Sequence, residues 1–155
     1  MNEKKLTLLP SDELFDSICQ LLSEGYDAQF TVTGNSMWPF FAHERDRVTL
    51  RSVPCTTLKK GDIVLYRAKH GYLLHRIMRI KHDFVQTAGD HNCYLDEPVS
   101  QSIIIAKVVS FTRKEKEISC QNLSYRLISF FWRIFFPIRP ILLRILFCFI
   151  RRIGR

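Results

Sequence analysis

A serine stands where a predicted strand ends, in the segment GNSMWP at positions 34–39. The Gly-Asn turn before Ser36 holds the serine at the strand end, with its backbone N–H groups turned outward. That arrangement can present a nucleophilic hydroxyl together with an oxyanion hole formed by the Ser36 N–H and the backbone at Gly34 and Asn35. The segment is not a G-x-S-x-G elbow, because the second glycine is missing. A serine in such a turn can equally be an ordinary turn residue.

A serine hydroxyl is a weak nucleophile without a base, and His75 is the candidate base. It lies within YLLHRIM at positions 72–78, a predicted strand with apolar neighbours, whereas Lys59, Lys60 and Lys69 fall at predicted turns. A neutral imidazole can accept a proton near neutral pH. A histidine at the edge of the core that bonds a backbone carbonyl would show the same pattern.

The polar loop GDHNCYLD at positions 89–96 carries two candidate acids, Asp96 and Asp90. Either carboxylate could orient the imidazole of His75 and stabilise its charged form. Loop aspartates also form turns without any catalytic role.

The cysteine and histidine spacing predicts no metal site and no cofactor. The five cysteines include no C-x-x-C pair and their number is odd, which argues against a disulfide framework and a zinc ribbon. We interpret them as reduced thiols. His91 and Cys93 could contact a metal only with further ligands that the sequence does not visibly supply.

The hydrophobic pattern predicts a mainly β domain of short antiparallel strands after a short helix. The helix is expected from Ser11 to Gly25, with Leu14, Ile18, Leu21 and Leu22 on its apolar face. Strands are expected at 30–33, 47–50, 63–66, 72–80, 84–87 and 103–111. Gly71 predicts a hairpin that pairs residues 64–67 with 72–74. The charged run at 113–117 is expected to form a solvated hairpin tip.

The chain of 155 residues, with 46% hydrophobic and 25% charged residues, suits one compact domain and excludes a long disordered protein. Its net charge of +8 is concentrated in the last 33 residues, which contain seven arginines and no acid. Residues 1–122 therefore carry a net charge of only +1. This distribution argues against a nucleic-acid-binding body. The N-terminus lacks the apolar run of a cleavable secretory signal.

The segment 121–155 is predicted to be a basic amphipathic helical tail. On a helical projection most of its arginines form one stripe, and Pro137 and Pro140 are expected to divide it in two. The unfavourable free energy of inserting the arginines into a bilayer cancels the favourable contribution of the apolar residues, so a membrane-spanning helix is not expected. We expect instead an interfacial pair of helices on anionic lipid. A shallow hairpin and a soluble cap on the β domain are the alternatives. The residues expected at the membrane are Arg126, Trp132, Arg133, Arg144 and Arg151.

Five segments in one order resemble the conserved boxes of the type I signal peptidase and SOS-repressor peptidase superfamily. They are GNSMWP at 34–39, RDRV at 45–48, GDIV at 61–64, LHRI at 74–77 and GDHN at 89–92 followed by Asp96. The resemblance covers roughly residues 30–109. Bacterial members use a Ser–Lys dyad, whereas the archaeal and endoplasmic-reticulum type has histidine in place of the lysine. Because His75 stands at that position, this chain resembles the Ser–His type.

The resemblance implies a role for each candidate residue. Ser36 would be the nucleophile, His75 the general base that later protonates the leaving amine, and Asp96, ahead of Asp90, the orienting acid. Two positions depart from the family pattern. Gly34 replaces a serine that helps to bind the oxyanion in many signal peptidases, so the hole would rely on backbone N–H groups. Arg45 stands where a glycine usually precedes the aspartate.

The chain is therefore predicted to be a signal-peptidase-like serine endopeptidase that cleaves a leader or signal segment of an extended peptide substrate. Residues 1–28 would form the N-terminal helix and lead-in, 29–120 the peptidase domain and 121–155 the membrane-associating tail, with the cytoplasmic face favoured. A non-catalytic or self-processing regulator of the repressor type is the alternative, although residues 1–29 are too few for a DNA-binding domain. A membrane-binding module with a degenerate catalytic site is the third candidate function.

Overall fold

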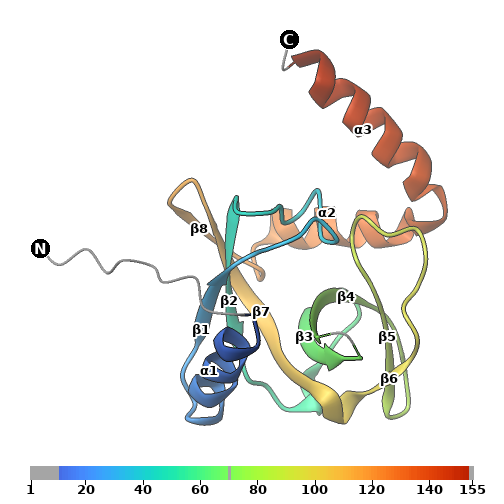
Figure 1. The fold of residues 1–155 in the computed structure, drawn as a ribbon. Helices are drawn as coiled ribbons and strands as arrows, with labels where there is room; N and C mark the ends of the chain where they lie inside the picture. The colour runs from blue at the N-terminus through green and yellow to red at the C-terminus, as the bar shows by residue number, and fades with distance from the viewer. Residues whose placement is uncertain (1–10, 70, 154–155) are drawn as a thin grey trace, which may run out of the picture.

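The computed structural model describes residues 11–69 and 71–153 and shows a mainly antiparallel β domain with one N-terminal helix and two C-terminal helices (Figure 1). This confirms the predicted fold class. The strands are β1 (Ala28–Thr31), β2 (Asp46–Arg51), β3 (Ile63–Ala68), β4 (Gly71–Lys81), β5 (Phe84–Ala88), β6 (Val99–Ser100), β7 (Ile104–Arg113) and β8 (Lys116–Ser119). They form one sheet in the order β1-β2-β7-β3-β4-β5-β6, with β8 paired to β7.

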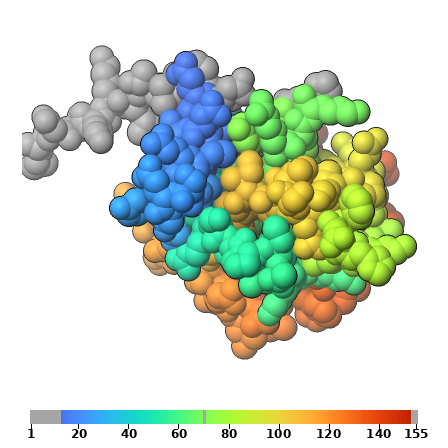
Figure 2. Space-filling view, turned by 90° about the horizontal axis from the view of Figure 1, so that it is seen from below, coloured from blue at the N-terminus to red at the C-terminus, as the bar shows by residue number. Residues whose placement is uncertain are grey.

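Helix α1 (Ser11–Ser23) covers one side of the sheet. Ile18 and Leu22 are buried in the main core, and the ring of Phe15 stacks on that of Tyr72 at 4.4 Å. Figure 2 shows α1 lying beside β7 and the β3–β4 hairpin on this face. Leu21, expected on the apolar face, is 43% exposed, whereas Leu14 and Phe15 pack against the core beside Ile18 and Leu22.

The hairpin around Gly71 is confirmed. Arg67 pairs with Tyr72 and Val64 with His75, so the register is the predicted one. Gly71 has φ 120°, a left-handed value that only glycine adopts without strain. This hairpin carries His75 along β4, away from the turn.

Several predicted boundaries differ from the structure by one or two residues, and three of these differences have a local cause. The first strand is Ala28–Thr31 rather than 30–33, because Val32 has left the ladder and bonds instead to Asp46 and Glu44 through its backbone. Ile103 belongs to a 3-10 turn, η2 (Gln101–Ile103), before β7. The charged tip is shorter than 113–117: only Lys114 and Glu115 form the turn, because the flanking residues extend β7 and β8.

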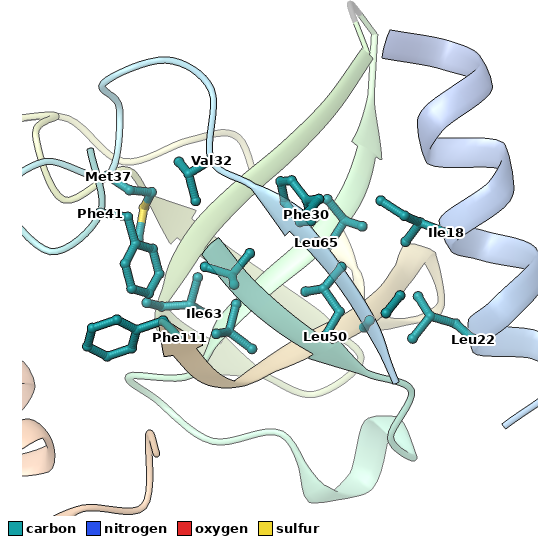
Figure 3. Close-up of a cluster of buried hydrophobic side chains, with 14 residues drawn as sticks. Ile18, Leu22, Phe30, Val32, Met37, Phe41, Leu50, Ile63, Leu65 and Phe111 are labelled. Atoms are coloured by element: carbon teal, nitrogen blue, oxygen red, sulfur yellow. The ribbon is translucent and has the colours of Figure 1, made fainter. Parts of the chain in front are cut away.

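The main core anchors the loop that follows β1. Figure 3 shows Met37 and Phe41, both from this loop, pointing into the cluster of buried side chains that includes Ile63 and Phe111. The rings of Phe41 and Phe111 lie 5.2 Å apart. Ser36, which precedes Met37, is therefore held by a buried side chain although it is itself exposed.

The C-terminal segment forms α2 (Leu123–Ile134) and α3 (Arg139–Ile153), joined by the 3-10 turn η3 (Phe136–Ile138). The predicted division at Pro137 and Pro140 is confirmed. Helix α2 lies across one end of the β domain, and α3 extends away from it (Figure 1). Within the described ranges, none of the helices combines the length and apolar character that crossing a bilayer requires.

Candidate catalytic site

His75 is a buried histidine whose ring is bound by a carboxylate. Its Nδ1 lies 2.7 Å from Oδ2 of Asp96, and the two side chains are only 5% and 15% exposed. The same carboxylate oxygen accepts a hydrogen bond from Thr87 Oγ1 at 2.7 Å and a longer one from the Tyr66 hydroxyl at 3.4 Å. Three donors thus fix Asp96, and Asp96 fixes the imidazole plane.

The Asp96 carboxyl is held in its charged form. Burial by itself would raise the pKa of Asp96, but the hydrogen bonds from His75 and Thr87 outweigh it and hold the pKa below the usual carboxyl value. Burial also raises the pKa of Tyr66 to about 12, so its hydroxyl remains a donor. An ionised Asp96 favours a proton on His75 Nδ1 and leaves Nε2 as the nitrogen that can accept one.

The lowered pKa of Asp96 predicts an acid-sensitive contribution to stability. The contribution is fully present above the unfolded-state pKa of about 4 and is lost as the pH falls through the lower folded-state value. Wild type should therefore lose more stability than Asp96→Asn on acidification from about pH 5 to pH 2, measured as the shift in Tm. Glu97→Gln, which removes an exposed carboxylate, should follow wild type; equal acid sensitivity in all three proteins would contradict this account.

The other ring nitrogen, His75 Nε2, is buried and lacks a hydrogen-bond partner among the described residues. A buried polar atom without a partner costs free energy, so a further hydrogen bond to Nε2 would be favourable. Nε2 does not hydrogen-bond to Ser36 Oγ in this state. Bonds between a catalytic serine and its base are often long without substrate and shorten when substrate binds.

Backbone contacts connect the Ser36 turn to the segment that follows β5. Ala88 is the last residue of β5 and pairs with Arg76, the neighbour of His75, so Gly89 follows at the level of the histidine. The Ser36 carbonyl packs directly on Gly89 and accepts the N–H of His91 at 2.9 Å. The turn that begins at Gly89 thus contacts the serine turn and directly follows the strand that pairs with β4 beside His75.

The predicted oxyanion donors are not equivalent. Gly34, at φ 83°, already donates its N–H to Nδ1 of His43 at 3.1 Å. The Asn35 carbonyl accepts the N–H of Trp38 in the same turn. The N–H groups of Asn35 and Ser36 have no partner among the described residues, so both remain available as backbone donors to an oxyanion.

Gly89→Ala tests the packing that holds Ser36. A Cβ at position 89 would lie 2.5 Å from the Ser36 carbonyl oxygen, well inside van der Waals contact. Overpacking of this kind costs roughly 1–3 kcal/mol, so we expect Tm to fall by several degrees. Any activity that depends on Ser36 should fall by about tenfold or more, since small displacements of reacting groups are costly. An unchanged Tm and activity would show that the carbonyl moves aside freely.

Asp90, the other candidate acid, does not contact His75. Its carboxylate forms a two-pronged ion pair with Arg76, at 2.8 Å and 2.7 Å, and both side chains are completely buried. The charge of Asp90 raises the pKa of Arg76 even though burial by itself would lower it. Arg76 also donates to the Gly61 carbonyl at 2.9 Å and to the Ser129 hydroxyl of α2. Asp90 therefore supports the loop rather than the imidazole.

The tail holds this same loop from its other side. Arg139, 1% exposed, donates from Nη1 to the carbonyls of Gly89 and Asn92, each at 3.0 Å. The Trp132 indole donates to the Asp90 carbonyl at 3.3 Å, and the Arg139 guanidinium lies 5.3 Å from the Trp132 ring centre. Burial lowers the pKa of Arg139. The C-terminal helices are thus part of the framework around Ser36.

Sequence reasoning missed Arg76, Ser129 and Arg139. Two signals were available: Arg76 lies between His75 and the apolar pair Ile77 and Met78 in the predicted strand, and Arg139 stands between two prolines, away from the stripe formed by most of the arginines. A buried arginine requires a partner, and neither sequence position identified one.

The five residues expected at the membrane fall into two groups. Arg126, Arg144 and Arg151 are exposed. Trp132 is half-buried and turned toward the β domain, because its indole N–H bonds Asp90 there. Arg133 is also half-buried and reaches the backbone at Gly61.

Among the described residues, no group of three or more His, Cys, Asp or Glu side chains is arranged to hold a metal ion. No protein-family model matches the chain, and no curated protein matches it either.

Proposed function

We propose that the chain is a signal-peptidase-like serine endopeptidase that cleaves a leader or signal segment and associates with a membrane through its tail. The observation that carries the proposal is the orientation of His75: Asp96 binds one ring nitrogen, and the other is buried without a partner. The five boxes that resemble the peptidase superfamily support the same assignment for Ser36.

In the proposed reaction Nε2 of His75 accepts and returns the proton, while Nδ1 stays bound to Asp96. His75 Nε2 removes the proton from Ser36 Oγ as the oxygen attacks the scissile carbonyl, and Asp96 stabilises the imidazolium that forms. The Ser36 N–H stabilises the oxyanion. His75 then protonates the leaving amine as the carbon–nitrogen bond breaks, and a water molecule hydrolyses the acyl-enzyme by the same proton path.

Association with a membrane is supported by where the apolar surface lies. Of eighteen exposed large hydrophobic side chains among the described residues, thirteen lie between Leu123 and Ile150. They share this segment with exposed arginines, and it contains no acid. Such helices bind anionic interfaces through apolar burial and charge together.

The direct test is to identify new protein N-termini. The purified full-length chain, in detergent, is incubated with peptides that carry an apolar leader segment, and the cleavage sites are mapped by mass spectrometry. We expect defined cuts that require added peptide. Fragments of the chain itself, formed without peptide, would favour a self-processing regulator instead, and the absence of any cut would reject the peptidase.

A further inference from the structure

A groove of about 780 Å3 runs between α2 and the segment that leads into β3. One wall contains Lys59, Lys60 and Asp62, and β7 contributes Lys107. The opposite wall is α2, with Arg126 and Arg133. The Arg133 guanidinium nitrogen lies 3.4 Å from the Cβ position of Gly61, so this side chain reaches from one wall toward the other.

The groove has a strong excess of positive charge. Five of its lining residues are basic and one, Asp62, is acidic. Asp62 is already engaged: its carboxylate accepts Lys107 Nζ at 3.3 Å and the Lys59 N–H at 2.9 Å. None of the other four basic side chains forms an ion pair with a residue that the structure describes. Four cations therefore remain without a counter-ion in one groove.

The α2 wall is also apolar. Leu123, Leu127 and Phe130 line the groove and are 68%, 49% and 47% exposed. A ligand that satisfies both walls needs an anionic group beside a hydrocarbon chain. A nucleic acid or an inorganic anion would satisfy the cations and leave these side chains in water.

We propose that this groove binds the headgroup of an anionic phospholipid, with the phosphate among Lys59, Lys60, Arg126 and Arg133 and the acyl chains along the apolar side of α2. The proposal rests on the proposed association of the tail with a bilayer. It identifies the lipid headgroup that orients the protein on that bilayer. It is independent of Ser36 and His75. The phosphate would replace water around the cations with a fixed anion, which favours one orientation of the β domain on the surface.

The test compares two charge-matched double variants on vesicles. Lys60→Gln/Arg126→Gln removes two exposed cations from the groove, and Arg79→Gln/Lys81→Gln removes two exposed cations from β4, outside it. The full-length chain is sedimented with phosphatidylcholine vesicles that contain phosphatidylglycerol, and with phosphatidylcholine alone. We expect the groove variant to bind anionic vesicles roughly tenfold or more weakly and the β4 variant to bind like wild type. On phosphatidylcholine alone the three proteins should bind equally.

Each other result overturns the proposal in a recognisable way. Equal losses in both double variants would show general charge attraction without a site. No loss in either would show that the groove does not contact the lipid. Displacement of wild type from vesicles by millimolar glycerol phosphate would assign the groove to a soluble anion. If wild type binds neither vesicle, the membrane association itself fails, while the cleavage experiment still tests the peptidase.

Discussion

Replacing Ser36 with alanine should reduce leader-peptide cleavage by about 10⁴-fold or more without lowering Tm. The side chain is exposed and its hydroxyl makes no hydrogen bond with the described residues, so its removal leaves the fold intact. Cleavage would lose the atom that forms the acyl-enzyme. The initial rate is measured with the same peptide for wild type, Ser36→Ala and Ser52→Ala, the last being another exposed serine.

His75→Ala should cause a loss of similar size, and the double variant should be no slower than either single variant. Residues that act in one step are non-additive, because the nucleophile has no route without its base. Additive losses would mean that the two side chains act separately. Retained cleavage in Ser36→Ala would place the nucleophile elsewhere and remove the basis of the proposed mechanism.

The largest effect on stability is expected at the ion pair between Arg76 and Asp90. Arg76→Gln leaves a completely buried carboxylate without its cation, and breaking a buried pair in this way costs about 3–5 kcal/mol. For a chain of this size the Tm should fall by roughly 6–20 °C, measured by thermal unfolding. The cost arises because Asp90 cannot reach water while α2 covers it.

Two further variants isolate the cause. Arg51→Gln breaks the ion pair with Asp27, in which the side chains are 57% and 35% exposed, and should cost less than about 1 kcal/mol. The double variant Arg76→Met/Asp90→Leu removes both charges and should be more stable than Arg76→Gln. If Arg76→Gln is no less stable than Arg51→Gln, the pair does not contribute as its burial implies.

The strands were predictable because each carries a local signal. Alternating β-branched and aromatic residues between glycine turns define β2 to β5 and β7 to within about two residues, and Gly71 defines the register that places His75. Strand β6 and strand β8 escaped prediction. They are two and four residues long, and pairing with β5 and β7 determines them more than their own composition does.

The candidate site was predictable only in part, for a similar reason. Side chains that a motif names, such as Ser36, His75 and Asp96, could be selected from their local sequence. The roles of Asp90 and Trp132 could not, because each depends on a partner distant in the chain: α2 and Arg139 meet the loop at Gly89 only after the tail has folded over the domain. An arginine-rich apolar segment looks the same in sequence whether its arginines face lipid or a buried carboxylate.

The position of Arg139 in the sequence also determines when the loop at Gly89 can form all of its hydrogen bonds during synthesis. Synthesis proceeds from the N-terminus, so the residues of the sheet, His75 among them, emerge before Arg139, which holds the loop that begins at Gly89. A nascent chain that already contains every sheet residue still lacks the donors that hold the Gly89 and Asn92 carbonyls. The loop that begins at Gly89 therefore reaches its final hydrogen bonding only after Arg139 has been synthesised and the helical segment has folded onto the sheet.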